Sequence, residues 1–267
     1  MRVETAQLSG SDTNADRVFV ADQAVIMLDG ASAFEPVDVD PATYTDLLGH
    51  VIADQLDQDQ DAELAAAVAH AIGHAAAHLG LTAGHSPSST VSVLRTRGEM
   101  VDFYVLGDSP IYYGTGRTTH RVYDARLSSV AEPEHHRYVS QLRAGRGYNA
   151  EHRAALVTLQ RAQRRQRNLD ARYWIAEAEP RAARHGITTS QPASAVDWAV
   201  LPTDGASDFI DHTDRSWAEI GGYDAGQLAD LLARIHQWES ATDPDGQHLP
   251  RAKRHDDKTV AVVRDIP

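Results

Sequence analysis

The chain has 267 residues, of which 42% are hydrophobic, so it can bury one large core, and we expect a single domain over residues 1–267. Its 38 acidic and 25 basic residues give a formal net charge of −13, which disfavours general electrostatic binding to nucleic acid or to an anionic membrane. The chain has no cysteine, no apolar stretch near the ~20 residues that span a bilayer and no signal-like start, so we expect a soluble, cytoplasmic protein without thiol chemistry.

Short apolar runs that are rich in β-branched residues and end at Gly, Asp or Pro predict strands. In chain order these runs are Val18–Val20, Ala24–Leu28, Thr90–Leu94, Val101–Leu106, Ile111–Tyr113, Val196–Leu201 and Thr259–Val263.

Apolar residues at helical spacing predict two helices within Pro41–Leu79, another within Asn149–Ala178 and a last one over Gly221–Glu239. The segment Ala241–Arg254 carries Pro, Asp and Gly residues and is expected to be a long surface loop. The middle strands are close enough in the sequence to pair as antiparallel neighbours. This order predicts an α+β fold with sheets covered by helices, rather than a regular βαβ series.

Aspartates stand at the ends of several predicted strands. Asp29-Gly30, Asp108 and Asp204-Gly205 each follow a strand, and Asp256-Asp257 precedes the last one. Any one of them is explained by a turn, because Asp and Gly both tolerate positive φ. Carboxylates gathered at one rim would repel one another unless cations lay between them, so the set favours a metal site. Ligation by oxygen alone favours Mg²⁺ or Mn²⁺ over zinc.

Five short motifs together resemble a known family. They are Asn14-Ala15-Asp16-Arg17, Leu28-Asp29-Gly30-Ala31-Ser32, Gly107-Asp108-Ser109, Pro202-Thr203-Asp204-Gly205 and Asp256-Asp257-Lys258-Thr259. In order and spacing they resemble the motifs of type 2C (PPM) metal-dependent protein serine/threonine phosphatases, in particular bacterial members. The resemblance covers nearly the whole chain. It implies a central antiparallel β-sandwich flanked by α-helices on both sides, a dinuclear metal centre at one end, and a variable flap at about residues 114–190.

The resemblance also implies a set of metal ligands. Asp29 corresponds to the carboxylate that bridges both metals, and Gly30 to the residue that lends its backbone carbonyl. Asp204 and Asp256 correspond to the remaining ligands of the first metal. Asp108 resembles the residue that, with Asp204, holds a third and looser metal in bacterial members. The expected cofactors are therefore two Mn²⁺ or Mg²⁺ ions per active site, with room for a third.

The implied catalytic residues are Asp16, Asp29 and Asp204. Asp16 corresponds to a carboxylate that orients metal-bound water. Two cations lower the pKa of a water between them, so that hydroxide attacks phosphorus in line, and no phosphoenzyme is needed.

The sequence departs from the family pattern in three places. The glutamate expected before Asp16 is Ala15, the phosphate-binding arginine expected about four positions earlier is Ser11, and the histidine that follows Asp-Gly in many eukaryotic members is absent from Ala31-Ser32. Arg17 is the candidate that would bind the substrate phosphate instead, unless strand alternation directs it to solvent.

Two further patterns have ordinary alternatives. His70, His74 and His78 form one row on a helix, as a metal site requires, but no Glu accompanies them, and the alanine-rich segment favours a semi-polar helix face. Arg161, Arg164, Arg165 and Arg167 are either a solvated helix face or a flap surface that attracts phosphorylated or acidic substrate.

The leading hypothesis is a phosphatase that acts on phosphoserine or phosphothreonine of a phosphoprotein substrate. One alternative is a catalytically weak or inactive relative that binds a partner, because Ala15 and Ser11 replace expected ligands. Another is a phosphatase for small phosphate esters. The sequence leaves the substrate, the metal and the oligomeric state open.

Overall fold

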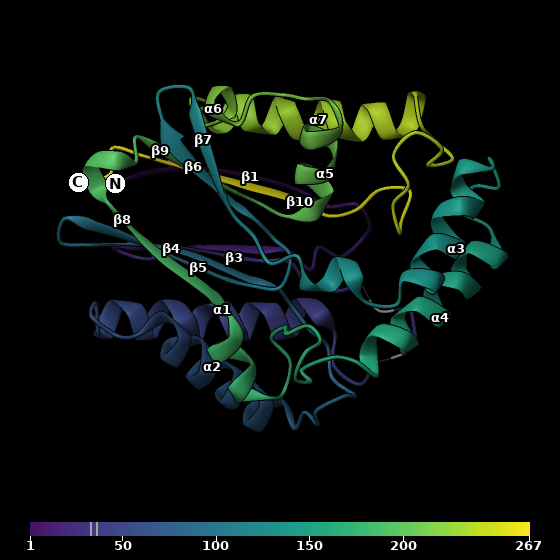
Figure 1. Cartoon of the computed structure of the whole chain (residues 1–267), viewed down its shortest axis with the longest axis horizontal. Helices are drawn as coiled ribbons and strands as arrows, with labels where there is room; N and C mark the ends of the chain where they lie inside the picture. Colours follow the sequence, from purple (N-terminus) through teal and green to yellow (C-terminus); the bar gives the residue numbers. More distant parts are fainter. Residues whose placement is uncertain (33, 36) are drawn as a thin grey trace.

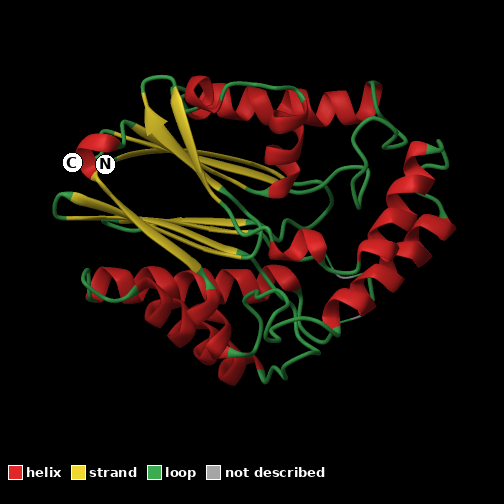
Figure 2. Cartoon of the chain, in the orientation of Figure 1, coloured by secondary structure: helices red, strands yellow, loops and turns green. Residues whose placement is uncertain are grey.

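The computed structural model describes residues 1–32, 34–35 and 37–267. Its centre consists of two antiparallel sheets that face each other (Figure 1, Figure 2). The strand order of the first sheet is β1 (Arg2–Leu8), β10 (Lys258–Arg264), β9 (Trp198–Pro202), β6 (Ile111–Thr115) and β7 (Thr118–Val122). The order of the second sheet is β2 (Arg17–Val20), β3 (Ala24–Leu28), β4 (Val91–Arg97), β5 (Met100–Leu106) and β8 (Ile187–Pro192).

Helices cover the outer face of each sheet, which gives four layers (Figure 1). The second sheet is covered by α1 (Pro41–Gln58) and α2 (Leu64–Leu79), and the first by α5 (Asp204–His212), α6 (Trp217–Ile220) and α7 (Ala225–Ala241). A hairpin of α3 (Glu132–Arg143) and α4 (Ala150–Arg164) lies at one end of the sandwich, and both termini lie at the other end. Short 3-10 helices occupy Arg126–Ser129, Pro180–His185 and Ala193–Ala195.

Each interface between layers has its own apolar core. Between the sheets, side chains such as Met27, Phe103 and Val263 are fully buried, because alternate residues of each strand point inward. The helical hairpin has a separate small core that includes Leu142 and Leu156. The hairpin is therefore a packed unit in its own right, placed against the end of the sandwich.

The predicted α+β class, with antiparallel sheets and helices on both sides, is confirmed. The helix predicted within Asn149–Ala178 is wrong over its second half, since α4 ends at Arg164. The chain turns at Asn168, where φ is 54°, and a buried ion pair of 3.0 Å joins Arg167 to Glu177. This ion pair stabilises a segment after α4 that has no regular secondary structure.

Among the residues described, no helix is both long enough and apolar enough to cross a membrane.

Candidate active site

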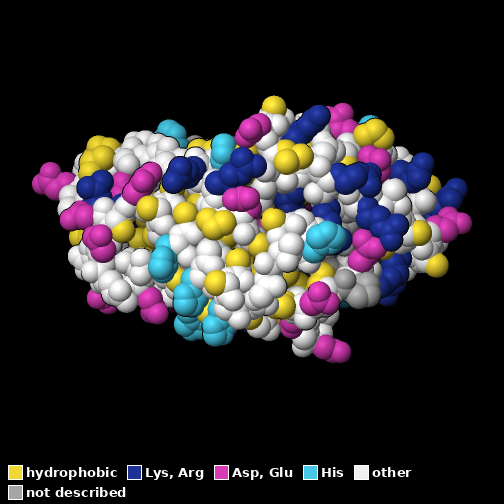
Figure 3. Space-filling view, turned by 90° about the horizontal axis from the view of Figure 1, so that it is seen from below, with side chains coloured by type: hydrophobic (Ala, Val, Ile, Leu, Met, Phe, Trp, Pro, Cys, Tyr) yellow, Lys and Arg dark blue, Asp and Glu magenta, His cyan; other side chains and the backbone are white. Residues whose placement is uncertain are grey.

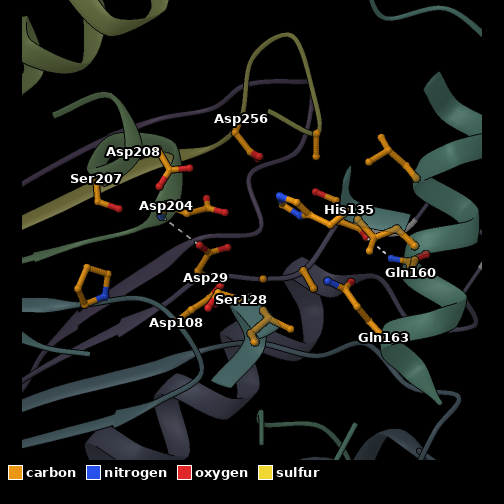
Figure 4. A pocket seen from close by; sticks show the side chains of 18 of the residues that line it. Asp29, Asp108, Ser128, His135, Gln160, Gln163, Asp204, Ser207, Asp208 and Asp256 are labelled. Atoms are coloured by element: carbon orange, nitrogen blue, oxygen red, sulfur yellow. Dashed lines mark hydrogen bonds between the residues drawn. The ribbon is translucent and has the colours of Figure 1, made fainter. Parts of the chain in front are cut away.

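Acidic side chains from separate elements meet in a pocket of about 430 Å³ at the end of the sandwich that faces the hairpin (Figure 4). All five residues predicted as metal ligands line this pocket: Asp29, Gly30, Asp108, Asp204 and Asp256. The sequence therefore identified residues that are far apart along the chain and close together in the fold.

Asp29 follows the fully buried strand β3. Its N–H donates to Thr90 Oγ1 at 3.2 Å, and its carbonyl accepts from the Thr90 N–H at 3.0 Å, so its backbone is fixed by β4. A Cβ at position 30 would lie 2.6 Å from the Ala15 carbonyl oxygen, and only glycine fits there. The Asp-Gly pair is therefore a close-packed strand end.

Asp204 is the first residue of α5 and follows β9 directly. Its N–H donates to Asp29 Oδ2 at 3.3 Å. A Cβ at Gly205 would collide with the Asp257 carbonyl oxygen, so the helix can start here only with glycine at that position. The close approach of the two chain segments brings Asp204 and Asp29 to the same rim.

The two neighbouring acids before β10 have different environments. Asp256 lines the pocket and forms an ion pair of 2.6 Å with Lys253. Asp257 is buried, and its carboxylate accepts from the N–H groups of Gly10 and Ala15, each at 2.9 Å. Asp257 thus fixes the N-terminal loop, and Asp256 remains available to the pocket.

Crowding changes the acidity of this cluster. Withdrawal from bulk water raises the pKa of Asp29, Asp204 and Asp16 well above the usual range, and repulsion between the carboxylates raises it further. Burial likewise raises the pKa of Asp108 to about 6, with a contribution from the charge of Asp124. The described side chains around the pocket do not neutralise these carboxylates. A bound cation would neutralise them and would reduce the repulsion between them.

Two predicted residues do not line the pocket. Asp16 is buried, and its Oδ2 accepts from the Thr203 hydroxyl at 2.7 Å. The guanidinium of Arg17 donates to the Asn14 carbonyl at 2.7 Å and to Asp46 of α1 at 3.2 Å. Arg17 is the first residue of strand β2. Side chains alternate between the two faces of a strand, and the side chain of Arg17 lies on the face toward α1. We therefore do not retain Arg17 as a substrate-binding residue.

The pocket also contains residues that the sequence analysis missed. Asp208 lies four residues after Asp204 on α5, a spacing that places both on one helix face and was visible in the sequence. Its pKa is raised to about 7, first by withdrawal from water and then by the charge of Asp108. Arg121 of β7 is the one Lys or Arg among the described lining residues, and its guanidinium lies 4.0 Å from the centre of the Tyr123 ring.

His135 extends from α3 toward the aspartates (Figure 4). Partial withdrawal from water lowers its pKa, and the neighbouring His136 lowers it further. His135 therefore releases a proton more readily than a fully exposed histidine. It lies on the hairpin, opposite the strand ends that carry the carboxylates, and no sequence motif marked it.

Comparison with known proteins identifies the architecture. No protein-family model and no curated protein matches the chain. Solved structures match over nearly its whole length. The serine/threonine phosphatase PstP/Ppp of Mycobacterium tuberculosis is 18% identical with a TM-score of 0.58, and 98% of this chain and 97% of that chain are covered.

Two further structures agree with this match. The PPM Ser-Thr phosphatase MsPP of Mycobacterium smegmatis is 15% identical, with a TM-score of 0.58 and coverage of 99% of this chain and 98% of that chain. PppA of Pseudomonas aeruginosa is 16% identical, with a TM-score of 0.56 and coverage of 98% and 96%. The chain has the fold of PPM-type phosphatases. At these identities the likeness establishes the fold, as the sequence motifs predicted.

The donor atoms of this pocket suit Mg²⁺ or Mn²⁺, because they are carboxylate oxygens. Within the described parts of the chain, no three of its aspartates bring their oxygens within 4.8 Å of one another.

A tighter group of potential ligands, His236, Glu239 and His255, lies outside the pocket. The Lys258 ammonium is 2.9 Å from Glu239 Oε2, and the same oxygen is 2.8 Å from His255 Nδ1. Lys258 thus already compensates the carboxylate. Because His255 and Lys258 flank Asp256 in the sequence, Glu239 of α7 holds the loop that presents Asp256.

The histidine row of α2 is remote from this pocket. His70, His74 and His78 are exposed, with ring centroids 6.3 and 6.0 Å apart along the row. Figure 3 shows histidine side chains gathered on the outer face of the α1–α2 layer. The row therefore forms a solvated helix face.

The raised pKa values predict how the metal-free protein responds to pH. A carboxyl whose pKa is higher in the folded than in the unfolded state stabilises the fold at low pH, and this contribution is lost as the pH rises through the folded pKa. For Asp108 and Asp208 the folded values are about 6 and about 7. In excess chelator, the melting temperature should fall between pH 5 and pH 8, and Mn²⁺ should restore it at pH 8.

The variant Asp208→Asn provides the control. His135 and His236, whose pKa values are lowered by burial, change stability in the opposite direction over this range. The informative quantity is therefore the difference between wild type and variant, which should show a shallower decline. An equal decline in both proteins would contradict the role given to Asp208.

Proposed function

We propose that the chain is a metal-dependent phosphatase that hydrolyses phosphoserine and phosphothreonine on proteins. The observation that carries the proposal is the convergence of four aspartates, from three strand ends and the start of α5, on one pocket where burial, and after it the charge of other carboxylates, raises the pKa of Asp29, Asp108 and Asp204. A neighbour with this fold, the catalytic domain of PstP, has been solved in complex with two manganese ions.

In this proposal Asp29, Asp204, Asp256 and the carbonyl of Gly30 would hold two divalent cations, and Asp108 with Asp204 would hold a looser third. Bound Mn²⁺ or Mg²⁺ supplies an activated water and neutralises charge on the phosphoryl group.

Residues of the pocket wall complete the chemistry. When the phosphorus–oxygen bond breaks, the serine or threonine oxygen must gain a proton, and His135 is the imidazole that faces the carboxylates from the hairpin. Arg121 gives the pocket a positive charge that attracts the phosphate. Asp16, hydrogen-bonded to Thr203 behind the rim, would orient water and fix the start of α5.

A rival function is a weak or inactive relative that binds a partner. Ala15 supplies no carboxylate, and its carbonyl and Cβ are packed against Gly30. Ser11 lies in an exposed loop outside the pocket lining. Hydrolysis of small phosphate esters would use the same aspartates and differ only at the hairpin wall.

Removal of metal tests the proposal. Phosphate release from a phosphothreonine peptide should require added Mn²⁺ or Mg²⁺ and should stop in excess chelator, because the proposed nucleophile is a metal-activated water. Full turnover in excess chelator would refute the metal-dependent mechanism.

A further inference from the structure

A second cavity adjoins the active-site pocket on the side of the hairpin. It has a volume of about 450 Å³ and lies between the first half of α4 and the loop that leads to Asp256. Phe34, Leu156 and Ala252 line both cavities, so the two cavities adjoin each other. We call this second cavity the hairpin groove; its other lining residues include Tyr148, His152, Arg153, Lys253 and Arg254.

The hairpin groove is basic in an acidic protein. Three cations line it, whereas the adjoining pocket is lined by six aspartates and one arginine. Lys253 pairs with Asp256, but Arg153 and Arg254 are exposed and form no ion pair within the described residues. They therefore remain available to an outside anion.

The surrounding hairpin has the same sign of charge. Residues 132–164 contain six arginines and three acidic residues, although the whole chain has a net charge of −13. Figure 3 shows Lys and Arg side chains gathered at this end of the molecule. Such a field favours the approach of a negatively charged segment.

Two buried polar groups of the hairpin groove have no partner. His152 is 4% exposed; its Nε2 donates to the Ala252 carbonyl at 2.9 Å, and its Nδ1 has no hydrogen bond. The Tyr148 hydroxyl is also buried without a partner. An unsatisfied buried polar atom is costly, so the free Nδ1 of His152 fits a ligand that supplies a hydrogen bond. The Tyr148 hydroxyl lies against Gly246, which is outside the groove lining. With Nε2 as donor, neutral His152 presents Nδ1 as an acceptor, which suits a peptide N–H.

We propose that the hairpin groove binds an acidic segment of the protein substrate beside the phosphorylated residue. Arg153 and Arg254 bind its carboxylates, His152 bonds to its backbone, and Phe34 and Leu156 form an apolar floor. A peptide satisfies all three features, whereas a free anion satisfies only the first. This inference rests on the proposed function and adds a substrate preference to it, namely phosphosites flanked by Asp or Glu.

The test compares two peptides that differ only in charge. Each carries a non-hydrolysable phosphonate in place of phosphothreonine, flanked on both sides either by Glu or by the isosteric Gln. Fluorescence anisotropy with the full chain and Mn²⁺ at low ionic strength should show about tenfold tighter binding of the Glu peptide, as two exposed charge pairs would give. The double variant Arg153→Glu/Arg254→Glu should lose this preference.

A matched control distinguishes binding in the hairpin groove from long-range attraction by the other basic residues of the hairpin. Arg137→Glu/Arg143→Glu makes the same charge change at exposed positions of α3 outside the groove, and it should keep the preference for Glu. Equal binding of the two peptides by wild type, or equal loss of preference in both double variants, would overturn the proposal.

A separate assay with p-nitrophenyl phosphate, which has no peptide, should give the same turnover in wild type and in the groove variant. Absence of this turnover in wild type with Mn²⁺ would refute the proposed function. The anisotropy comparison would still test whether the hairpin groove binds the acidic segment, because peptide binding requires no catalysis.

Discussion

Replacement of Asp29 by Asn should lower kcat by on the order of 100-fold or more, and it should remove most of the thermal stabilisation that Mn²⁺ gives to the wild type. A ligand that binds only the folded state at about 100 times its Kd adds about 2.7 kcal/mol, or roughly 5–10 °C for a chain of this size. Asn keeps the shape of the side chain but carries no charge.

The same variant should also differ from the wild type in its melting temperature when no metal is bound. Because burial and the charges of Asp16 and Asp256 raise the pKa of Asp29, removing its charge relieves repulsion in the metal-free protein. Metal-free Asp29→Asn should therefore melt at or above the temperature of the metal-free wild type near pH 8. An undiminished Mn²⁺ shift in this variant would show that Asp29 is not a ligand.

Replacement of His135 by Gln should have an effect that depends on the leaving group. For a phosphothreonine peptide the departing alkoxide is strongly basic and needs a proton, so kcat should fall about 100-fold, within the range for general acid catalysis. For p-nitrophenyl phosphate the departing anion is stable, so turnover should change little. Rates for both substrates at one Mn²⁺ concentration provide the test.

His136→Gln is the matched control, because His136 is the exposed neighbour on α3 and does not line the pocket. It should leave both rates close to wild type. Equal losses for both substrates in His135→Gln would mean that His135 supports the pocket wall rather than donating a proton.

The sequence predicted the carboxylate rim because rigid strands place their ends predictably. Asp29 and Asp108 end buried apolar strands, and Asp204 follows another. Their common location followed from the resemblance of these motifs to those of type 2C phosphatases. The glycines beside Asp29 and Asp204 were part of the same motifs. The structure shows why they are glycines, since backbone from another segment lies against each of them.

The opposite wall of the pocket could not be predicted in the same way. The sequence of α3 is polar, with only Tyr138 and Leu142 buried, so no apolar stripe indicated a helix. The edge strands β7 and β8 are largely exposed and lack the apolar runs of the inner strands. His135 and Arg121 belong to these elements, and tertiary packing alone brings them to the aspartates.

Arg17 shows a second limit of prediction from the sequence, namely the direction in which a strand side chain points. Its position in the first motif suggested phosphate binding, but the side to which a strand residue points depends on register and on what the neighbouring helix offers. Asp46 of α1 and the Asn14 carbonyl occupy its guanidinium. Neither partner is identifiable from local sequence.

Phosphate release from a phosphothreonine peptide by wild type and by Asp204→Asn, with and without Mn²⁺, tests the central claim most directly. Release by the wild type should occur only when Mn²⁺ is present, and the rate should be lower by on the order of 100-fold in the variant, whose N–H to Asp29 is retained but whose charge is lost. Equal metal-stimulated rates in the two proteins, or no release by the wild type at any Mn²⁺ concentration, would contradict this claim.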